Sequence, residues 1–498
     1  MGNQPNTPSN NQRATTVFDL DVDALSRCVR NLSLQDLSRM AMTCKFFRGV
    51  AYSDSIWHGW LREHCPQQYT SSSFSQISGV REAYLARRTA LHQFKFHDPL
   101  TRYLLENPTP CSHILLDKNH VYLAQGSSVF LMEDAFSGDK FPSEGKMQWA
   151  HNARITCMRL FSNKDTWFQS EAQNNDNVLV TSSSDWTIRL WWKGRSQRCL
   201  RGRNGPVTTL ADKLLGDSSG EVLASGGQDG TVRLWSLGSS GKRGKRALKT
   251  TLHGHEKPVT LLSVPGHNPS LLVSVSKDAK VRVWDTSASS GARSSGCVGM
   301  ACVHGALVGI KCHEALCYIA AGSSVTAIDL RTMRKVSTAA IHQPKLYSFE
   351  SLPSKSLICT GGDDKTMLWD IRKNQEKPKP VAIMDGHSGY VAHIHMDPYK
   401  IVTGGPEDLY VKVWETDTGI LANSFTCCIP DFEESSGGLL AMSVKGCRIV
   451  TSSWCLEPGL LEPGLICFRD FTNASNPLSS SECSSTTKFW ESEFSFDG

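Results

Sequence analysis

Short alternations of apolar and polar residues recur along most of the chain and predict β-strands. Five segments share one pattern: an apolar strand, a small-residue turn with an aspartate, a second alternating strand and a closing tryptophan. They read VLVTSSSDWTIRLW, VLASGGQDGTVRLW, LLVSVSKDAKVRVW, LICTGGDDKTMLW and KIVTGGPEDLYVKVW, and they end at Trp191, Trp235, Trp284, Trp369 and Trp414. Each segment is therefore predicted to form a tight hairpin.

The spacing of these tryptophans predicts further copies of the unit. They lie 44, 49, 85 and 45 residues apart, so the long gap is twice the ordinary period. The segment YIAAGSSVTAID fills that gap, with Ile328 in place of tryptophan, and two more worn copies lie around Met132 and Phe468. The count predicts eight repeat units, each of which would form one blade of a ring of sheets, or seven blades if a terminal unit is not a full one.

These units need one another to fold. A single hairpin unit cannot bury both faces of its sheet, so neighbours must stack, and a closed ring leaves only short, protected strand edges. Residues 111–471 are therefore predicted to form a mainly β structure, a β-propeller. The repeat pattern resembles the WD-repeat family, which implies four strands per blade.

Helical spacing replaces this alternation before the propeller. Two sets of residues lie at i, i+3, i+4 and i+7 and predict two short amphipathic helices: Leu25, Cys28, Val29 and Leu32, then Leu37, Met40, Ala41 and Cys44. Ser33 is expected to cap the second helix, with Asp36 in its first turn. Residues 66–110 are expected to be a linker with a third helix at about 76–94. The polar residues 1–16 and the Ser-rich tail 472–498 are expected to be disordered.

Residues 17–65 resemble an F-box. The resemblance rests on Leu32, Asp36-Leu37, Cys44-Lys45, Phe47-Arg48 and the span from Asp54 to Trp57, whereas Asp21 stands where the family usually has proline. It implies docking on a Skp-type adaptor, and through it on a cullin and a RING protein. The adaptor-binding residues implied are Leu20, Leu25, Val29, Leu32, Leu34, Leu37, Met40, Cys44, Phe47 and Trp57.

Together the two resemblances imply the substrate-recognition subunit of an SCF-type ubiquitin ligase, with the propeller binding the protein to be ubiquitinated. A helical module of about 45 residues has too little interior to cover all its apolar side chains, which independently favours a partner. Such a receptor positions a substrate, is not itself an enzyme and needs no cofactor. No P-loop, nucleophile elbow or metal-ligand spacing points to another activity.

Histidines precede several of the turn aspartates. His255, Ser274, Asp278 and Trp284 could be written as a hydrolase triad with a tryptophan, but the set recurs with the repeat, as in His387, Asp408 and Trp414. We therefore expect a buried structural network in each blade, which WD-repeat proteins also use. His342 precedes Asp364 by 22 residues, and Arg203 stands at the aligned position of another blade, where the network should be altered.

Two other functions remain open. Trp369-Asp370-Ile371-Arg372 matches the W-D-x-R box by which many WD-repeat proteins attach to the adaptor of cullin-4 ligases, although Arg372 could equally pair with Asp370 at a strand end. Loss of adaptor binding in Arg372→Glu but not in Leu37→Asp would favour that function. The third reading is a protein-interaction scaffold without ligase coupling.

Charge and composition limit the classes of partner and the compartment expected for this chain. The chain has 53 basic and 48 acidic residues, and its net charge of +5 is too dilute to indicate nucleic acid. Its 17 cysteines show no C-x-x-C spacing, which favours a reducing compartment, and no apolar run suits a membrane; we expect a cytoplasmic or nuclear protein. The residues before the turn aspartates are Ser184, Gln228, Lys277, Asp363 and Glu407. Only one is basic, so a phosphate-binding pocket is not supported, and the protein substrate stays open.

Overall fold

The computed structural model divides the chain into two compact units, residues 1–90 and residues 91–498. The structure describes residues 22–64, 79–82, 84–85, 94, 99–105, 111–117, 120–132, 136, 147–162, 177–192, 195–215, 221–237, 247–286, 296–373, 378–416, 418–427, 436–457, 460–461 and 465–471. The two terminal segments expected to be disordered lie outside these residues.

The first unit is helical, with four helices over residues 22–64, where two were predicted. They are α1 (Val22–Val29), α2 (Leu34–Thr43), α3 (Lys45–Ala51) and α4 (Asp54–His64). Ser33 caps α2 as expected, because its Oγ accepts a hydrogen bond from the backbone N–H of Asp36 at 3.1 Å. Cys44 does the same for α3 through its Sγ, 3.4 Å from the N–H of Phe47. Residues 80–82 and 84–85 of the expected third helix are also helical.

An aromatic cluster forms the core of this helical unit. Trp57 and Trp60 pack edge to face with ring centroids 5.3 Å apart, and Tyr84 contacts both rings. The indole N–H of Trp57 donates to the carbonyl of Ala51 at 2.9 Å, and that of Trp60 to the carbonyl of Arg30 at 2.8 Å. The two indoles are thus buried with their polar atoms satisfied, as a small core requires.

The second unit is an eight-bladed β-propeller, so the prediction of eight blades is confirmed and seven is excluded. The first four blades are β2 (Cys111–Asp117), β3 (His120–Gln125), β4 (Ser128–Met132) and β5 (Met147–Ala150); β6 (Ile155–Ser162), β7 (Asn177–Ser183), β8 (Ile188–Trp192) and β9 (Arg195–Leu200); β10 (Val207–Leu215), β11 (Glu221–Gly227), β12 (Val232–Ser236) and β13 (Leu248–Leu252); β14 (Val259–Ser263), β15 (Leu271–Ser276), β16 (Lys280–Asp285) and β17 (Cys297–Cys302).

The next three blades follow the same order of four antiparallel strands. They are β18 (Leu307–His313), β19 (Leu316–Ala321), β20 (Ser324–Asp329) and β21 (Lys335–Ile341); β22 (Ser348–Leu352), β23 (Leu357–Gly361), β24 (Lys365–Asp370) and β25 (Ala382–Asp385); β26 (His393–Met396), β27 (Lys400–Gly404), β28 (Tyr410–Glu415) and β29 (Leu421–Thr426). A short 3-10 helix, η5 (Pro353–Lys355), joins β22 to β23.

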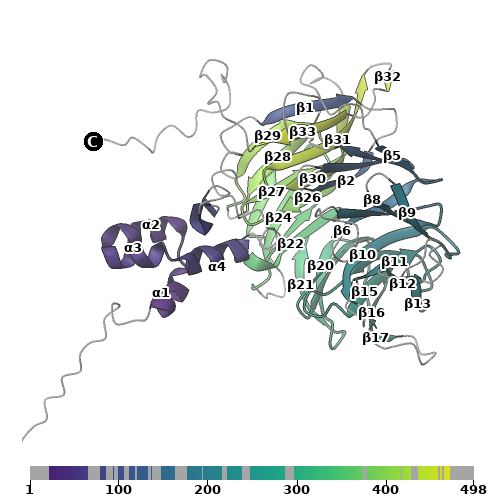
Figure 1. The fold of residues 1–498 in the computed structure, drawn as a ribbon, viewed down its shortest axis with the longest axis horizontal. Helices are drawn as coiled ribbons and strands as arrows, with labels where there is room; N and C mark the ends of the chain where they lie inside the picture. Colours follow the sequence, from purple (N-terminus) through teal and green to yellow (C-terminus); the bar gives the residue numbers. More distant parts are fainter. Residues whose placement is uncertain are drawn as a thin grey trace, which may run out of the picture. The chain divides into compact units, whose positions relative to one another are not determined.

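The eighth blade joins the two ends of the propeller. It contains β30 (Ser436–Lys445), β31 (Arg448–Glu457), the short β32 (Leu460–Leu461), β33 (Leu465–Asp470) and β1 (Leu100–Leu105). β1 pairs antiparallel with β33, from Leu100 opposite Asp470 to Leu105 opposite Leu465, and Figure 1 shows it beside that strand. The expected helical linker up to residue 110 is therefore wrong for this segment, and the propeller begins before residue 111.

The hydrophobic core lies mainly between blades. The first strands of successive blades contact one another around the ring, and β30 contacts β2 to complete it. Trp284 of the fourth blade is fully buried against Val232 and Leu234 of the third, so a closing tryptophan packs on the preceding blade. Ile328, which replaces tryptophan in the fifth blade, is buried in the same way against the fourth. The worn repeat thus keeps the apolar contact without the indole.

Candidate functional site

The blade network is present in the fourth blade. His255 Nδ1 lies 3.0 Å from Asp278 Oδ2, and its Nε2 lies 2.7 Å from Ser274 Oγ. The indole N–H of Trp284 donates to the same Ser274 oxygen at 2.7 Å. The Ser274 hydroxyl is fully buried, so no substrate can reach it as a nucleophile.

Two other blades carry the same set. In the seventh, His387 lies 2.6 Å from Asp408 and 2.8 Å from Thr403, whose hydroxyl accepts from Trp414 at 2.7 Å. In the second, His151 bridges an aspartate and a threonine, and Trp191 completes the set. Sequence reasoning did not single out His151, because the insertion between its strands lengthens the spacing to the turn aspartate to 34 residues.

The electrostatics of the network favour an ionised carboxylate hydrogen-bonded to a neutral imidazole. Burial alone would raise the pKa of Asp278, but hydrogen bonds from the backbone of Lys280, from His255 and from the backbone of Glu256 outweigh it and hold that pKa below its usual value. Burial lowers the pKa of His255 despite the neighbouring carboxylate. The histidine is therefore neutral at pH 7, which suits a structural hydrogen bond.

The third blade is altered at the expected position. The guanidinium of Arg203 replaces the imidazole, donates to Ser225 Oγ at 2.7 Å and lies 3.3 Å from Asp229. Trp235 donates to the same Ser225 oxygen at 2.7 Å, so the hydroxyl keeps its place between two donors. Arg203 is buried, and burial lowers its pKa to about 10.

The sixth blade keeps only part of the set. His342 Nδ1 lies 3.0 Å from Thr360 Oγ1, and Trp369 donates to the same oxygen at 2.8 Å. In the described part of this blade, Asp364 is not hydrogen-bonded to His342. The turn is one residue shorter than in the fourth blade, and the other imidazole nitrogen lies against Gly362, where a Cβ would be 1.9 Å away.

The W-D-x-R box forms a surface fork at the end of β24. Arg372 binds Asp370 through its Nε at 3.0 Å and its Nη2 at 2.8 Å, and its backbone N–H donates to the same carboxylate at 3.0 Å. The Arg372 side chain remains 71% exposed. The local pairing that the sequence allowed is thus present, and it presents the guanidinium to solvent.

The predicted adaptor residues divide between the inside and the outside of the helical unit. Leu25, Val29, Leu37 and Trp57 are buried in its core, Leu34, Met40, Cys44 and Phe47 are half-buried, Leu32 is 39% exposed, and Leu20 lies outside the described residues. The buried four stabilise the unit, so any effect of theirs on a partner is indirect.

Other apolar residues of this unit are more exposed than the predicted ones. Leu37 is the buried residue of α2, whereas Met42 near its end is 70% exposed. Tyr52 is 48% exposed, with the Arg81 guanidinium 4.1 Å above its ring. Met42 belongs to neither helical stripe. Its position on an otherwise polar side of the helix is the feature of the sequence that could have indicated an exposed apolar residue.

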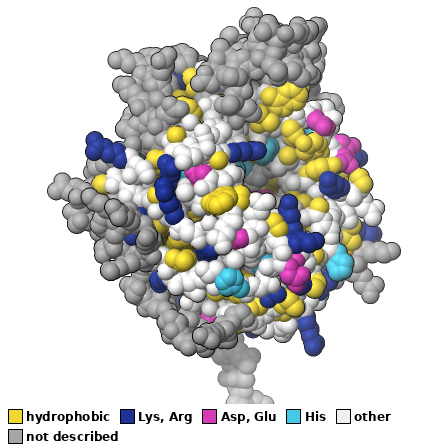
Figure 2. Space-filling model, turned by 90° about the vertical axis from the view of Figure 1, so that its right-hand side faces the viewer, with side chains coloured by type: hydrophobic (Ala, Val, Ile, Leu, Met, Phe, Trp, Pro, Cys, Tyr) yellow, Lys and Arg dark blue, Asp and Glu magenta, His cyan; other side chains and the backbone are white. Residues whose placement is uncertain are grey.

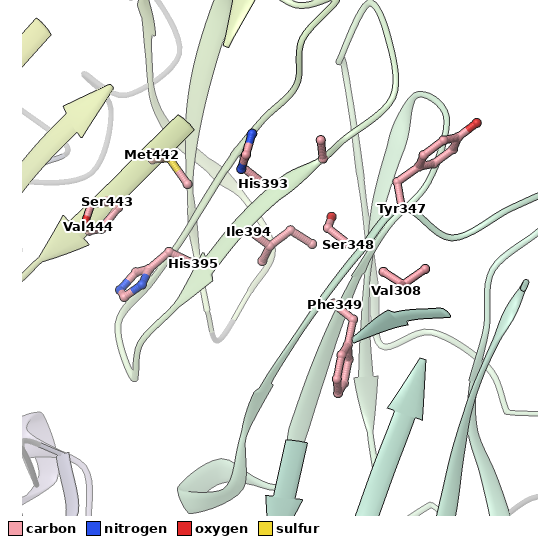
Figure 3. Close-up of a pocket in the computed structure, with 11 residues that line it drawn as sticks. Val308, Tyr347, Ser348, Phe349, His393, Ile394, His395, Met442, Ser443 and Val444 are labelled. Carbon is pink, nitrogen blue, oxygen red and sulfur yellow. The ribbon is translucent and has the colours of Figure 1, made fainter. Parts of the chain in front are cut away.

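The propeller offers a cavity of about 340 Å³ at the inner ends of its fifth to eighth blades. Figure 3 shows Tyr347 and Phe349 on one side, Met442 and His395 on the other, and His393 and Ile394 between them. Elsewhere on the propeller, basic, acidic and hydrophobic side chains are interspersed over the face in Figure 2. Across the described residues, no three His, Cys, Asp or Glu side chains gather as metal ligands would.

No helix in the described part of the chain has the length and apolar character to cross a membrane.

Two family descriptions match the sequence. "WD domain, G-beta repeat" matches residues 145–191, 194–236 and 246–285, and "F-box domain" matches residues 17–59.

Relatives match about half of the chain. The chain is 26% identical over 282 residues to Ribosome biogenesis protein YTM1 of Meyerozyma guilliermondii, covering 47% of this chain and 59% of that protein. It is 24% identical over 270 residues to Nuclear distribution protein nudF of Aspergillus niger, covering 48% and 57%. The Ribosome biogenesis protein WDR12 homolog of Arabidopsis thaliana is 26% identical over 302 residues, covering 51% and 65%. The chain thus spans less than two thirds of each of these relatives.

The crystal structure of the computationally designed Ika8 protein is similar in fold, with a TM-score of 0.52 and 18% identity over 73% of this chain and 97% of that chain. At this identity the likeness concerns the fold alone. With the F-box description matched in its helical unit and WD repeats matched in its propeller, the chain matches an F-box/WD-repeat protein in both of its parts.

Proposed function

We propose that this chain is the substrate-recognition subunit of an SCF-type cullin-RING ubiquitin ligase. Its helical unit would dock on a Skp-type adaptor, and the propeller would bind the protein to be ubiquitinated in the cytoplasm or the nucleus. The cullin and the RING protein would bring the ubiquitin-conjugating enzyme, so this chain supplies proximity and no catalytic group.

The observation that supports the proposal is a set of apolar side chains left exposed on the F-box unit. Met42, Tyr52 and Leu32 are 70%, 48% and 39% exposed, in a module whose core is built from Leu37 and Trp57. A small domain that leaves a methionine side chain this open near the end of a short helix gains stability when a partner covers it.

Substitutions at the exposed residues test the adaptor interface directly. The full chain carrying Met42→Asp or Leu32→Asp should bind a purified Skp-type adaptor about tenfold more weakly or worse, because a charge replaces a buried apolar contact. Val298→Asp is the matched control, since Val298 is 62% exposed on β17 of the propeller. Surface plasmon resonance with the adaptor immobilised gives the affinities, and circular dichroism checks that each variant is folded.

Leu37→Asp provides a second, different readout. It places a charge in the core of the F-box unit, so adaptor binding and helix content should be lost together. If Met42→Asp and Leu32→Asp both bound the adaptor like the unaltered chain, the docking surface proposed here would be wrong.

The fork at the end of β24 favours a rival adaptor. Arg372 is exposed and held by Asp370 in one geometry, as a guanidinium that binds a partner would be. Arg372→Glu should leave Skp-type binding unchanged under our proposal. Loss of binding to the cullin-4 adaptor in this variant, together with unimpaired function of Met42→Asp, would favour the cullin-4 reading instead. Binding of neither adaptor would favour a scaffold without ligase coupling.

A further inference from the structure

The cavity of the propeller has an aromatic entrance. Tyr347 lies in the connection between the fifth and sixth blades, and Tyr390 in the connection between the sixth and seventh. Their rings stack with centroids 4.6 Å apart and planes 29° apart, and both are half-buried. Tyr347 also lines the cavity, at the start of β22, so the tyrosine pair borders the cavity, and we call this border its entrance.

The ammonium group of Lys345 contacts the ring face of Tyr347. The Lys345 ammonium lies 4.7 Å from the centroid of the Tyr347 ring, a distance at which the electron-rich face attracts a positive charge. Lys345 is exposed, and the contact of its ammonium given by the described residues is the one with the Tyr347 ring. The face of the Tyr347 ring therefore accepts a cation. The Lys345 side chain is flexible, so a cation of a partner can replace its ammonium there.

Carboxylates set the sign of charge around the tyrosine pair. Asp363 and Glu407 occupy the turns between the second and third strands of the sixth and seventh blades. A hydrogen bond to Asp363 raises the pKa of Tyr347, and Glu407 adds to this rise from nearby. The Glu407 carboxylate lies over Gly389, next to Tyr390, where a Cβ would be 2.9 Å from its Oε2. Within the described residues, neither carboxylate forms an ion pair.

The interior of the cavity does not oppose a cation. Burial lowers the pKa of His393 and of His395, so both imidazoles are neutral at pH 7. A volume of about 340 Å³ is at the small end of ligand sites.

We propose that this entrance, formed by Lys345, Tyr347, Asp363, Tyr390 and Glu407, captures an arginine or lysine side chain of a partner polypeptide. The cationic head would stack on a tyrosine face and pair with Glu407 or Asp363. Arginine fits best, because a planar guanidinium both stacks and pairs bidentately. The net charge of the whole chain is +5, so the preference for a basic segment has to come from this local set.

The inference rests on the proposed receptor function only in calling that polypeptide a substrate; the binding itself can be tested alone. Fluorescence anisotropy of a fluorescein-labelled peptide of arginine-glycine repeats, titrated with the full chain, is the primary assay. Matched probes carry glutamate or phosphoserine in place of arginine. We expect the arginine peptide to bind and the two acidic peptides to bind at least ~10-fold more weakly.

Variants of the entrance locate the binding. Asp363→Asn combined with Glu407→Gln should weaken the arginine peptide about tenfold, and Tyr390→Ala several-fold, by about the amount that one charge-assisted pair and one cation–π contact supply. Lys345→Ala should strengthen binding, because it frees the face of Tyr347. Glu314→Gln is the matched control: it removes a carboxylate from the exposed turn at the far end of β18 and should change nothing.

Four results would overturn the inference: no binding of the arginine peptide, tighter binding of an acidic peptide, arginine binding that persists unchanged in the doubly neutralised variant, or weaker binding of the arginine peptide in Lys345→Ala. Adaptor binding, measured on the same preparations, separates the two proposals. If the adaptor binds and the arginine peptide does not, the receptor function stands and this entrance is not its substrate site; the reverse result leaves the entrance and removes the receptor.

Discussion

The third and fourth blades allow one matched test of the energetics of the ring. Asp278 of the fourth blade accepts hydrogen bonds from His255 at 3.0 Å and from the backbone N–H groups of Glu256 and Lys280 at 3.1 and 2.9 Å. Asp278→Ala leaves these donors without a partner, but the imidazole stays neutral. We expect a loss of about 1–3 kcal/mol in the free energy of unfolding, the usual cost of unpaired buried polar groups.

Asp229→Ala in the third blade should cost more, although the two aspartates hold the same repeat position. Asp229 lies 3.3 Å from Arg203 and 3.6 Å from Arg233, whose side chains are 1% and 9% exposed. It also accepts hydrogen bonds from the backbone and hydroxyl of Thr231. Removing it leaves two buried guanidinium groups without their counter-charge, for which about 3–5 kcal/mol is expected.

Urea denaturation followed by tryptophan fluorescence measures both losses at pH 7, provided the dependence on urea is the same in all variants. Arg203→His is the matched background, because it gives the third blade the set found in the fourth. In that background the cost of Asp229→Ala should fall towards that of Asp278→Ala. An equal loss for the two aspartates in the unaltered chain would refute the argument that the buried charge makes the difference.

Two further predictions concern strain and pH. Trp186 is 51% exposed and has a φ of 69°, a left-handed backbone conformation in which Asn is tolerated better. Trp186→Asn should therefore raise the free energy of unfolding by about 1 kcal/mol, as measured by thermal unfolding. An unchanged or lower melting temperature would mean that the indole makes compensating contacts. Burial lowers the pKa of His151 and His255 below 6.5, so the unfolded chain binds more protons below that pH. Stability should therefore be full above pH 6.5 and fall as the pH drops below it, whereas a rise on acidification in pH-dependent calorimetry would contradict the neutral state of these imidazoles.

The repeat period predicted most of the propeller from the sequence. A turn aspartate and a closing tryptophan mark a blade even when one of them is worn, because the contact that stacks blades needs only an apolar side chain, as Ile328 shows. β1 was missed for the opposite reason. Its sequence LTRYLL carries neither mark, since the strand supplies one edge of the last blade while the repeat marks of that blade lie in the other strands.

Helical periodicity predicted the apolar stripes of the F-box unit but not their roles. Leu25 and Leu37 lie on stripes and are buried, whereas Leu32 lies on one and is exposed. Periodicity identifies which residues share a helix face, and the packing of four helices decides which part of that face is covered. Met42 is exposed on the polar side of α2, so no stripe could identify it as part of a surface for a partner.

The residues that distinguish this propeller are departures from its repeat. At the position before the turn aspartate, the second to fourth blades have Ser184, Gln228 and Lys277, whereas the sixth and seventh, whose stacked tyrosines border the cavity, have acidic residues. The blade network cannot reveal this, because it must be satisfied in every blade whatever the ring binds. Residues that repeat stabilise the scaffold, and residues that differ between blades face solvent, where substitution costs little stability and alters recognition. The acidic entrance is thus a property of two neighbouring blades, and a count of charges over the whole chain, which is net basic, hides it.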